Sequence, residues 1–380
     1  MLPFRAGRAL RTDSATNKVI LGIPRDPLDV LTEACKLVHP VERSDVINLA
    51  VAVAIQKPCE LSPLELLKCR KSFFSRTLSI ICWLNEQEAS LHANTPPHLG
   101  KVMKGKRILL LDALLRESGH PDKLLCAHLE KGFPLFGRLQ TSSIFAEQWC
   151  PPALHPDELL RVAPKQNQWI LGSCKRSRHA YIDAAVWDAT LMDVEKGWAI
   201  GPFSLEEAQS MTDKPVVISR RFGAQQKNRV RAIDDLSASQ INACTGVKEK
   251  VRVESVDAAA TMIQEWMRAF HGSGRTLVGK TYDLKSACRQ LGICSEHLHA
   301  AWICVSSPYM TEPALFQLHA MPFGATAAVT NFLRCAEALK ACSATLLHFA
   351  WTSFFNDFII IAPEDCAEEQ TGPRGFSFSF

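Results

Sequence analysis

The sequence lacks long apolar stretches, and it also lacks internal repeats and long low-complexity tracts. The longest mostly apolar run covers 46–55 of the 380 residues, about half of the roughly 20 residues that a membrane-spanning helix needs. With 47% hydrophobic and 22% charged residues, the composition is that of an ordinary globular protein, neither disordered nor fibrous. We therefore expect two or three globular domains with a real core and no membrane partner.

Paired cysteine spacing is missing as well, although there are 14 cysteines. Because no secretory signal is visible, we expect free thiols in a reducing compartment, cytoplasmic or nuclear. One His/Cys group could suggest zinc: Cys288, Cys294, His297, His299 and Cys304. Its gaps match no standard zinc finger or ribbon, so we interpret it as a coincidence.

A strong excess of one charge is also absent, because the net charge is only +4. The positive charge is nevertheless concentrated: nine basic and three acidic residues lie between Lys214 and Arg252. A local cationic surface suits a polyanionic partner or phosphate groups. An ordinary solvated surface would give the same pattern, so charge alone does not decide between the two.

The first part of the chain is predicted to be helical over residues 1–140. Ser62-Pro63-Leu64-Glu65 combines a capping box with proline at the first helical position. Further helices are predicted at 104–117 and 121–131, each followed by glycine. Residues 141–200 are predicted to be an irregular linker region because prolines are frequent in its first part.

The second part, residues 201–363, changes to a mixed pattern of strands and helices. Ser204 and Ser255 are expected to cap helices. The expected strands are 216–219, 229–233, 276–284, 300–306, 314–318, 349–355 and 358–362, with short and long helices at 285–291 and 325–341. We expect an α+β domain here and a loose tail over 364–380.

Two acidic residues stand where strands end. Asn356-Asp357 separates two apolar strands, which predicts a hairpin with an acidic tip. Asp283 follows another apolar strand and precedes a helix. If the two carboxylates converge, they could hold Mg²⁺, which favours oxygen ligands. Each residue also has a purely structural interpretation, Asp357 as a turn former and Asp283 as a helix cap.

Four motifs in chain order resemble the reverse transcriptases of eukaryotic retroelements. They are Arg231-Ala232-Ile233-Asp234-Asp235 with Asn242, Asp283-Leu284-Lys285-Ser286-Ala287-Cys288, Met321-Pro322-Phe323-Gly324-Ala325, and Phe354-Phe355-Asn356-Asp357. They are similar to the family's fingers segment, first palm motif, nucleotide-pocket motif and Tyr-x-Asp-Asp hairpin. Each motif is weak alone, but their common order forms a specific pattern. The resemblance implies the fingers and palm of a right-hand polymerase, with an antiparallel palm sheet and packed helices.

The resemblance also implies an activity and its partners. The activity is RNA-directed DNA polymerisation, a two-metal nucleotidyl transfer on an RNA or DNA template-primer with dNTPs and Mg²⁺ or Mn²⁺. Asp283 and Asp357 would hold the metal, and Asn356 would occupy a third catalytic position. The implied nucleotide-binding residues are Lys227, Arg229, Arg231, Cys288, Pro322, Phe323 and Gly324. The three basic residues could equally be ordinary surface charges.

The sequence departs from the family at two positions. Asn356 stands where the family has its first hairpin aspartate, and a neutral amide binds Mg²⁺ far more weakly than a carboxylate. Cys288 stands where the family usually has the aromatic gate that senses the sugar. The family's thumb and RNase H are not visible after Ala362, so the resemblance implies a truncated copy or one piece of a larger product. We expect a weak or inactive polymerase.

Two rival functions stay open. One is a nucleic-acid-binding remnant that keeps the cationic surface without catalysis. The other is a P-loop hydrolase, because Gly274-Arg275-Thr276-Leu277-Val278-Gly279-Lys280-Thr281 matches G-x-x-x-x-G-K-[ST]. A true P-loop joins a strand to a following helix, whereas here a helix is expected before the motif and a strand within it. The oligomeric state is not determined by the sequence.

Overall fold

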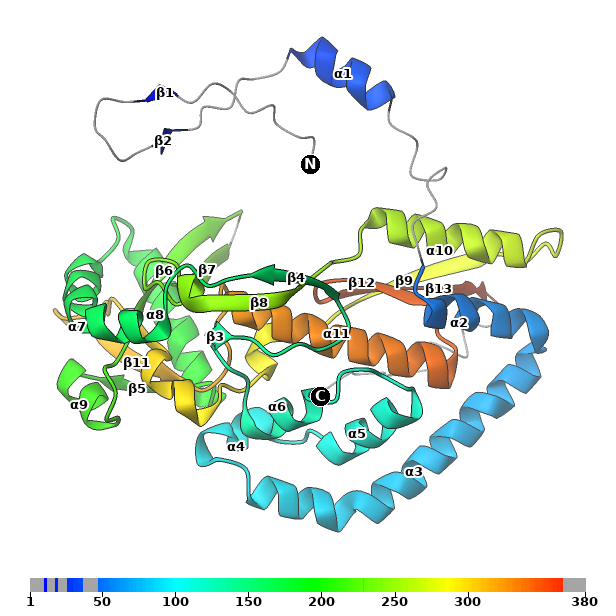
Figure 1. Cartoon of the computed structure of the whole chain (residues 1–380), viewed down its shortest axis with the longest axis horizontal. Coiled ribbons are helices and arrows are strands. Elements are labelled where there is room, and N and C mark those ends of the chain that lie inside the picture. The colour runs from blue at the N-terminus through cyan, green and yellow to red at the C-terminus, as the bar shows by residue number, and fades with distance from the viewer. Residues whose placement is uncertain (1–9, 12–17, 20–25, 37–46, 228, 365–380) are drawn as a thin grey trace.

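The computed structural model describes residues 10–11, 18–19, 26–36, 47–227 and 229–364. Within these residues the chain is an α+β protein, which confirms the predicted class (Figure 1). The tail predicted over 364–380 lies outside the described residues except for Glu364. No helix of the described part is long and apolar enough to cross a lipid bilayer.

The described part of the region predicted to be helical, residues 1–140, is largely helical. Its helices are α1 (Pro27–Cys35), α2 (Leu49–Glu60), α3 (Pro63–Ala93), α4 (Gly100–Met103), α5 (Ile108–Glu117) and α6 (Leu125–Lys131). The capping box at the start of α3 is confirmed, because Ser62 Oγ accepts from the Glu65 amide and the Glu65 carboxylate accepts from the Ser62 amide. The two short strands β1 (Leu10–Arg11) and β2 (Lys18–Val19), which form an antiparallel pair, were not expected.

The predicted irregular linker over 141–200 is wrong. This stretch contains β4 (Ala146–Cys150) and two long helices, α7 (Pro156–Ser173) and α8 (Ala180–Glu195). Pro156 occupies the first turn of α7, where proline has no hydrogen bond to lose, so it begins a helix instead of breaking one. Pro164 lies inside the same helix, and its cost is offset by buried residues such as Leu159 and Ile170.

A five-stranded mixed sheet lies at one end of the molecule, with strand order β5-β11-β10-β6-β7. Its members are β5 (Ala199–Phe203), β6 (Ile218–Gln226), β7 (Arg229–Asp235), β10 (Trp302–Val305) and β11 (Ala314–Leu318). β10 and β6 are parallel, and the other pairs are antiparallel. α7 contacts β6, and α8 contacts β5, β6 and β7. The helix capped by Ser204 is α9 (Leu205–Ser210), which contacts β11.

A three-stranded antiparallel sheet, β12-β13-β9, lies beside α10 and α11 (Figure 1). β9 is Leu277–Asp283, β12 is Trp351–Phe354 and β13 is Asp357–Pro363. α10 (Val256–Ala269) begins after the predicted cap Ser255 and contacts β12 and β13. A smaller sheet joins β3 (Gly137–Arg138), β8 (Thr245–Lys250) and β4.

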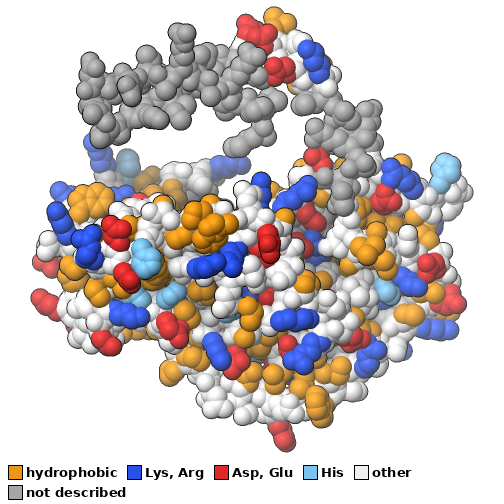
Figure 2. Space-filling view, viewed as in Figure 1, with side chains coloured by type: hydrophobic (Ala, Val, Ile, Leu, Met, Phe, Trp, Pro, Cys, Tyr) orange, Lys and Arg blue, Asp and Glu red, His pale blue; other side chains and the backbone are white. Residues whose placement is uncertain are grey.

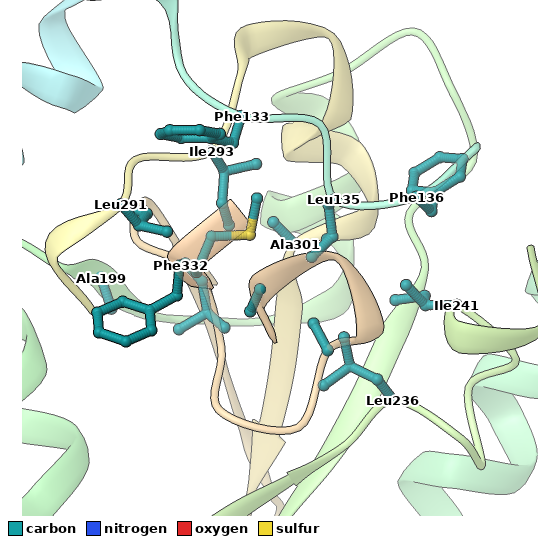
Figure 3. Packing of buried hydrophobic residues seen from close by; sticks show 14 of the residues in the cluster. Phe133, Leu135, Phe136, Ala199, Leu236, Ile241, Leu291, Ile293, Ala301 and Phe332 are labelled. Carbon is teal, nitrogen blue, oxygen red and sulfur yellow. The ribbon is translucent and has the colours of Figure 1, made fainter. Parts of the chain in front are cut away.

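α11 (Thr326–Leu347) runs through the middle of the molecule and connects its parts. It contacts α2, α3, α5, β12 and the short 3₁₀ helix η4 (Ala287–Gln290), which replaces the α-helix expected at 285–291. Figure 3 shows part of the core around it, which includes Phe332 of α11 together with Leu291 and Ile293. Because one apolar core includes residues from 99 to 358, the helical first half and the sheets fold around the same centre.

Candidate active site

Asp283 and Asp357, distant in sequence, lie directly opposite each other. Asp283 is the last residue of β9, Asp357 is the first residue of β13, and they are register partners in the antiparallel pair. Directly opposed residues project to the same face of a sheet, with Cβ atoms roughly 5 Å apart. Both side chains are exposed. The structure therefore places the two carboxylates close together at one end of the sheet, where a ligand can reach them.

The tip of the hairpin differs by one residue from the expectation. Phe355 and Asn356 form the turn, with Phe355 at φ 54°, whereas Asp357 already belongs to β13. The backbone carbonyl of Asn356 accepts a 2.9 Å hydrogen bond from the Leu284 amide. Because Asp357 lies in a strand and not in the turn, its side-chain direction is fixed by the sheet.

Asn356 contacts the acidic pair directly. Its Nδ2 donates a hydrogen bond to Asp283 Oδ1. An aspartate at this position would add a third negative charge and could not donate that bond. Within the described residues, no group of three or more His, Cys, Asp or Glu side chains is arranged to hold a metal ion. The cluster therefore consists of two carboxylates and one amide.

The Pro322–Gly324 turn leads into α11. Hydrogen bonds connect this turn and the start of α11 to Asn242, in the segment after β7. Gly324 has φ 109°, and a Cβ there would lie 3.1 Å from the Asp234 carbonyl oxygen. Asn242 Nδ2 donates to the Gly324 carbonyl (3.0 Å), and Asn242 Oδ1 accepts from the Thr326 amide (2.9 Å). Asn242 thus supplies the N-terminal cap that α11 lacks from its own residue Ala325.

The three residues of this turn differ in exposure. Pro322 is buried, whereas Phe323 is 60% exposed and Gly324 is also exposed. The exposed phenyl ring of Phe323 lies next to the exposed backbone of Gly324, and such a ring offers a flat apolar surface.

Cys288 lies in η4, five residues after Asp283, and is half-buried against the main core. Burial raises the pKa of its thiol to about 11. Cys288 is therefore a small, uncharged side chain at neutral pH.

Lys227, Arg229 and Arg231 lie on the β6–β7 hairpin. Lys227 is in its turn at φ 49°, and Arg229 and Arg231 project from the same face of β7. All three side chains are exposed, and within the described part of the chain none of them forms an ion pair. They form a cationic edge that is available to a polyanion.

The neighbouring Asp234 belongs to a buried ionic network that sequence reasoning missed. Arg221 binds Asp234 through Nε and Nη2, and it also contacts Asp193 of α8 at 3.0 Å. Arg289 Nη2 reaches Asp234 Oδ2 at 3.1 Å and Asp193 at 3.2 Å. Burial would raise the pKa of Asp234, but the charges of Arg221 and Arg289 outweigh it and hold that pKa below its usual value.

This network joins α8, the β6–β7 hairpin and η4, which follows Asp283. The available sequence signal is that Arg221 and Asp234 lie close to predicted strands and next to Phe222 and Ile233, since a charge that is buried there requires a partner. The partner itself is visible only in the fold, because Arg289 is far away in the chain.

The residues weighed as a zinc group make contacts with other parts of the chain. His297 Nδ1 accepts from the Leu135 amide at 2.9 Å, and burial lowers the pKa of His297 to about 4. Cys304 lies in β10 next to Cys174 of the α7 terminus. These side chains serve local packing and hydrogen bonding.

The P-loop interpretation of residues 274–281 is wrong. α10 comes before the motif, and β9 begins at Leu277 within it. A phosphate-binding loop needs a preceding strand and a following helix, which is the reverse order.

Comparison with protein-family models and with curated proteins found no match for this chain. The family resemblance therefore depends on the four motifs and on the positions of their residues.

Proposed function

We propose that residues 201–363 are the fingers and palm of a reverse transcriptase-like polymerase domain of a retrotransposon, weakened by Asn356. The observation that carries this proposal is the pairing of Asp283 with Asp357 across β9 and β13. Two carboxylates at that separation can share one divalent ion. The Pro322–Gly324 turn precedes α11, and η4 with Cys288 contacts α11, so these motif residues gather around one helix.

The side chains present suit one Mg²⁺ better than two. Mg²⁺ takes oxygen ligands, uses one or two carboxylates and completes its shell with water and substrate phosphate. Asp283 and Asp357 supply the carboxylates, and the Asn356 amide can offer one neutral oxygen. When bound, the ion would activate a primer 3′-hydroxyl and stabilise the departing pyrophosphate.

The other residues of the proposed site bind and position substrates. Lys227, Arg229 and Arg231 would neutralise phosphate charge on the dNTP or the template-primer. Phe323 and the backbone at Gly324 would form one wall of the nucleotide pocket. The Asn356 amide donates a hydrogen bond to Asp283 Oδ1, so it engages one of the four carboxylate oxygens of the pair.

A second candidate is nucleic-acid binding without catalysis. It is favoured by the same Asn356–Asp283 bond, in which an amide donor stabilises the Asp283 carboxylate. The exposed cationic edge of the β6–β7 hairpin would then be the functional surface.

The test is primer extension on an RNA template with Mg²⁺ or Mn²⁺, comparing the natural sequence with Asn356→Asp. We expect very weak extension by the natural sequence and at least about a 100-fold gain for Asn356→Asp, because metal ions contribute several kcal/mol to such transition states. The double variant Asn356→Asp with Asp283→Asn is the matched control, and it should lose the gain.

Template-primer binding, measured by fluorescence anisotropy, separates the two candidates. Binding that is weakened by Lys227→Gln, Arg229→Gln and Arg231→Gln together, with no extension even by Asn356→Asp, would favour the binding remnant. Absence of both binding and extension would reject both candidates.

A further inference from the structure

Two buried cysteines meet on the face of the five-stranded sheet that α7 covers. Cys174 is the C-terminal cap of α7, and Cys304 lies in β10, which pairs with both β6 and β11. The Cys174 thiol donates a hydrogen bond to the Cys304 carbonyl oxygen, with Sγ 3.6 Å from that oxygen. Both belong to one small apolar cluster, with Cys174 6% exposed and Cys304 fully buried.

A small molecule can reach the pair through a cavity that Cys174 lines. A cavity of about 110 Å³ is lined by Cys174 together with Lys175, Ser177, Asp183 and Arg220. A space of this size holds several water molecules, and hydrogen peroxide is only slightly larger than water. Cys304 does not line the cavity. A small oxidant can therefore reach Cys174 first.

The electrostatic surroundings separate the roles of the two thiols. The neighbouring Cys304 side chain lowers the pKa of Cys174, burial opposes this, and the charge of Arg220 lowers it further. The same contact and burial raise the pKa of Cys304. The thiolate is the nucleophilic form of cysteine. Since Cys174 also lines the cavity and Cys304 does not, Cys174 is the sulfur assigned to attack.

We propose that Cys174 and Cys304 are a peroxide-oxidised modification site that closes to an intramolecular disulfide. The Cys174 thiolate attacks one peroxide oxygen, the O–O bond breaks, and water leaves after taking up a proton, which gives a sulfenic acid. The Cys304 sulfur then attacks the Cys174 sulfur and releases a second water. The two thiols are oxidised by two electrons in total, and one hydrogen peroxide is reduced to two waters.

The disulfide would tie the end of α7 to a central strand of the sheet that carries the β6–β7 hairpin. This inference does not depend on the proposed polymerase function, because it concerns only the thiols and their cavity.

The experiment measures which thiols disappear. Exposed cysteines of the folded, full-length protein are first blocked with N-ethylmaleimide, and the protein is then treated with hydrogen peroxide. After denaturation, the remaining thiols are labelled with isotopically heavy N-ethylmaleimide and located by peptide mass spectrometry. We expect Cys174 and Cys304 to lose the heavy label together and to form a linked peptide lighter by two hydrogen atoms, which dithiothreitol reverses.

Three variants test the assigned roles. In Cys304→Ser, Cys174 should be trapped by dimedone as a sulfenic acid. In Cys174→Ser, Cys304 should keep its label after peroxide. Cys244→Ser is the matched control, since Cys244 is also buried and its pKa is raised by burial to about 11, and this change should leave the Cys174–Cys304 link intact.

A fourth variant is needed because serine in place of a buried cysteine can disturb the packing of the sheet. Arg220→Gln keeps both thiols and should slow the oxidation of Cys174. The proposal is overturned if Cys304 keeps its label in the natural sequence after peroxide, or if Cys174 oxidises without ever linking to Cys304.

Discussion

At the scale of single residues, Gly324 combines two constraints at the start of α11. Its φ of 109° is a conformation that L side chains rarely adopt, and an added Cβ would lie 3.1 Å from the Asp234 carbonyl oxygen. Gly324→Ala should lower the free energy of unfolding by about 1–3 kcal/mol, because the strain of such backbone angles is of that order. Urea denaturation would measure the loss.

Gly279→Ala is a matched control for this substitution. Gly279 lies in β9, and a Cβ there would meet nothing closer than 3.9 Å. Its stability should stay the same or rise slightly, since alanine restricts the unfolded chain. Equal losses for the two variants would contradict the special role of the turn at Gly324.

At the scale of elements, α11 depends on a cap from outside its own segment. Asn242 accepts from the Thr326 amide and donates to the Gly324 carbonyl. Asn242→Ala should destabilise the protein by about 1 kcal/mol, the usual cost of removing a helix cap. The shift of the urea midpoint at unchanged slope is the appropriate measurement.

Asn242→Asp separates the two hydrogen bonds of this cap. Aspartate keeps an acceptor for the Thr326 amide but has no donor for the Gly324 carbonyl. We expect it to recover most of the cap, with a loss smaller than that of Asn242→Ala. A loss as large as that of alanine would show that the bond to Gly324 matters more than the cap.

At the scale of the whole molecule, several histidines are buried in the neutral form. Burial lowers the pKa of His128, His297 and His319 to about 4, whereas the unfolded chain has a histidine pKa of about 6.5. Between these values the unfolded state binds more protons, so stability rises with pH there. We therefore expect stability to be full above pH ~6.5 and to fall progressively toward pH ~4.

Urea unfolding at a series of pH values measures this dependence. Each histidine can cost about 2 kcal/mol at pH 5, because one pKa unit corresponds to 1.36 kcal/mol. His128→Gln should flatten the dependence. A pH-independent midpoint between pH 7.5 and 5 would contradict the buried neutral state.

On the face of the molecule drawn in Figure 2, the described residues show no concentration of one charge that would indicate a binding surface. Figure 2 shows basic, acidic and hydrophobic side chains interspersed on the face in view. Charge on this face is therefore mixed, and the argument for a polyanion rests on the exposed residues of the β6–β7 hairpin.

The sequence by itself determined the elements whose local signals are strong. The capping boxes at Ser62 and Ser204 and the cap Ser255 begin helices where expected. The apolar strands β9, β11 and β13 lie within a residue or two of their predicted limits. These features depend on neighbours in the chain, such as a hydroxyl three residues before a glutamate, so no tertiary contact is needed to recognise them.

Only the tertiary structure decided the secondary structure of the segments between these elements. It also decided which side chains contact one another. α7 and α8 form in a proline-containing stretch because their apolar faces pack against the sheets, which local propensity does not show. The pairing of Asp283 with Asp357, the cap from Asn242 and the Arg221–Asp234–Arg289 network all join residues far apart in the chain. Such contacts are set by strand register and by the burial of charge, and both are properties of the folded chain as a whole.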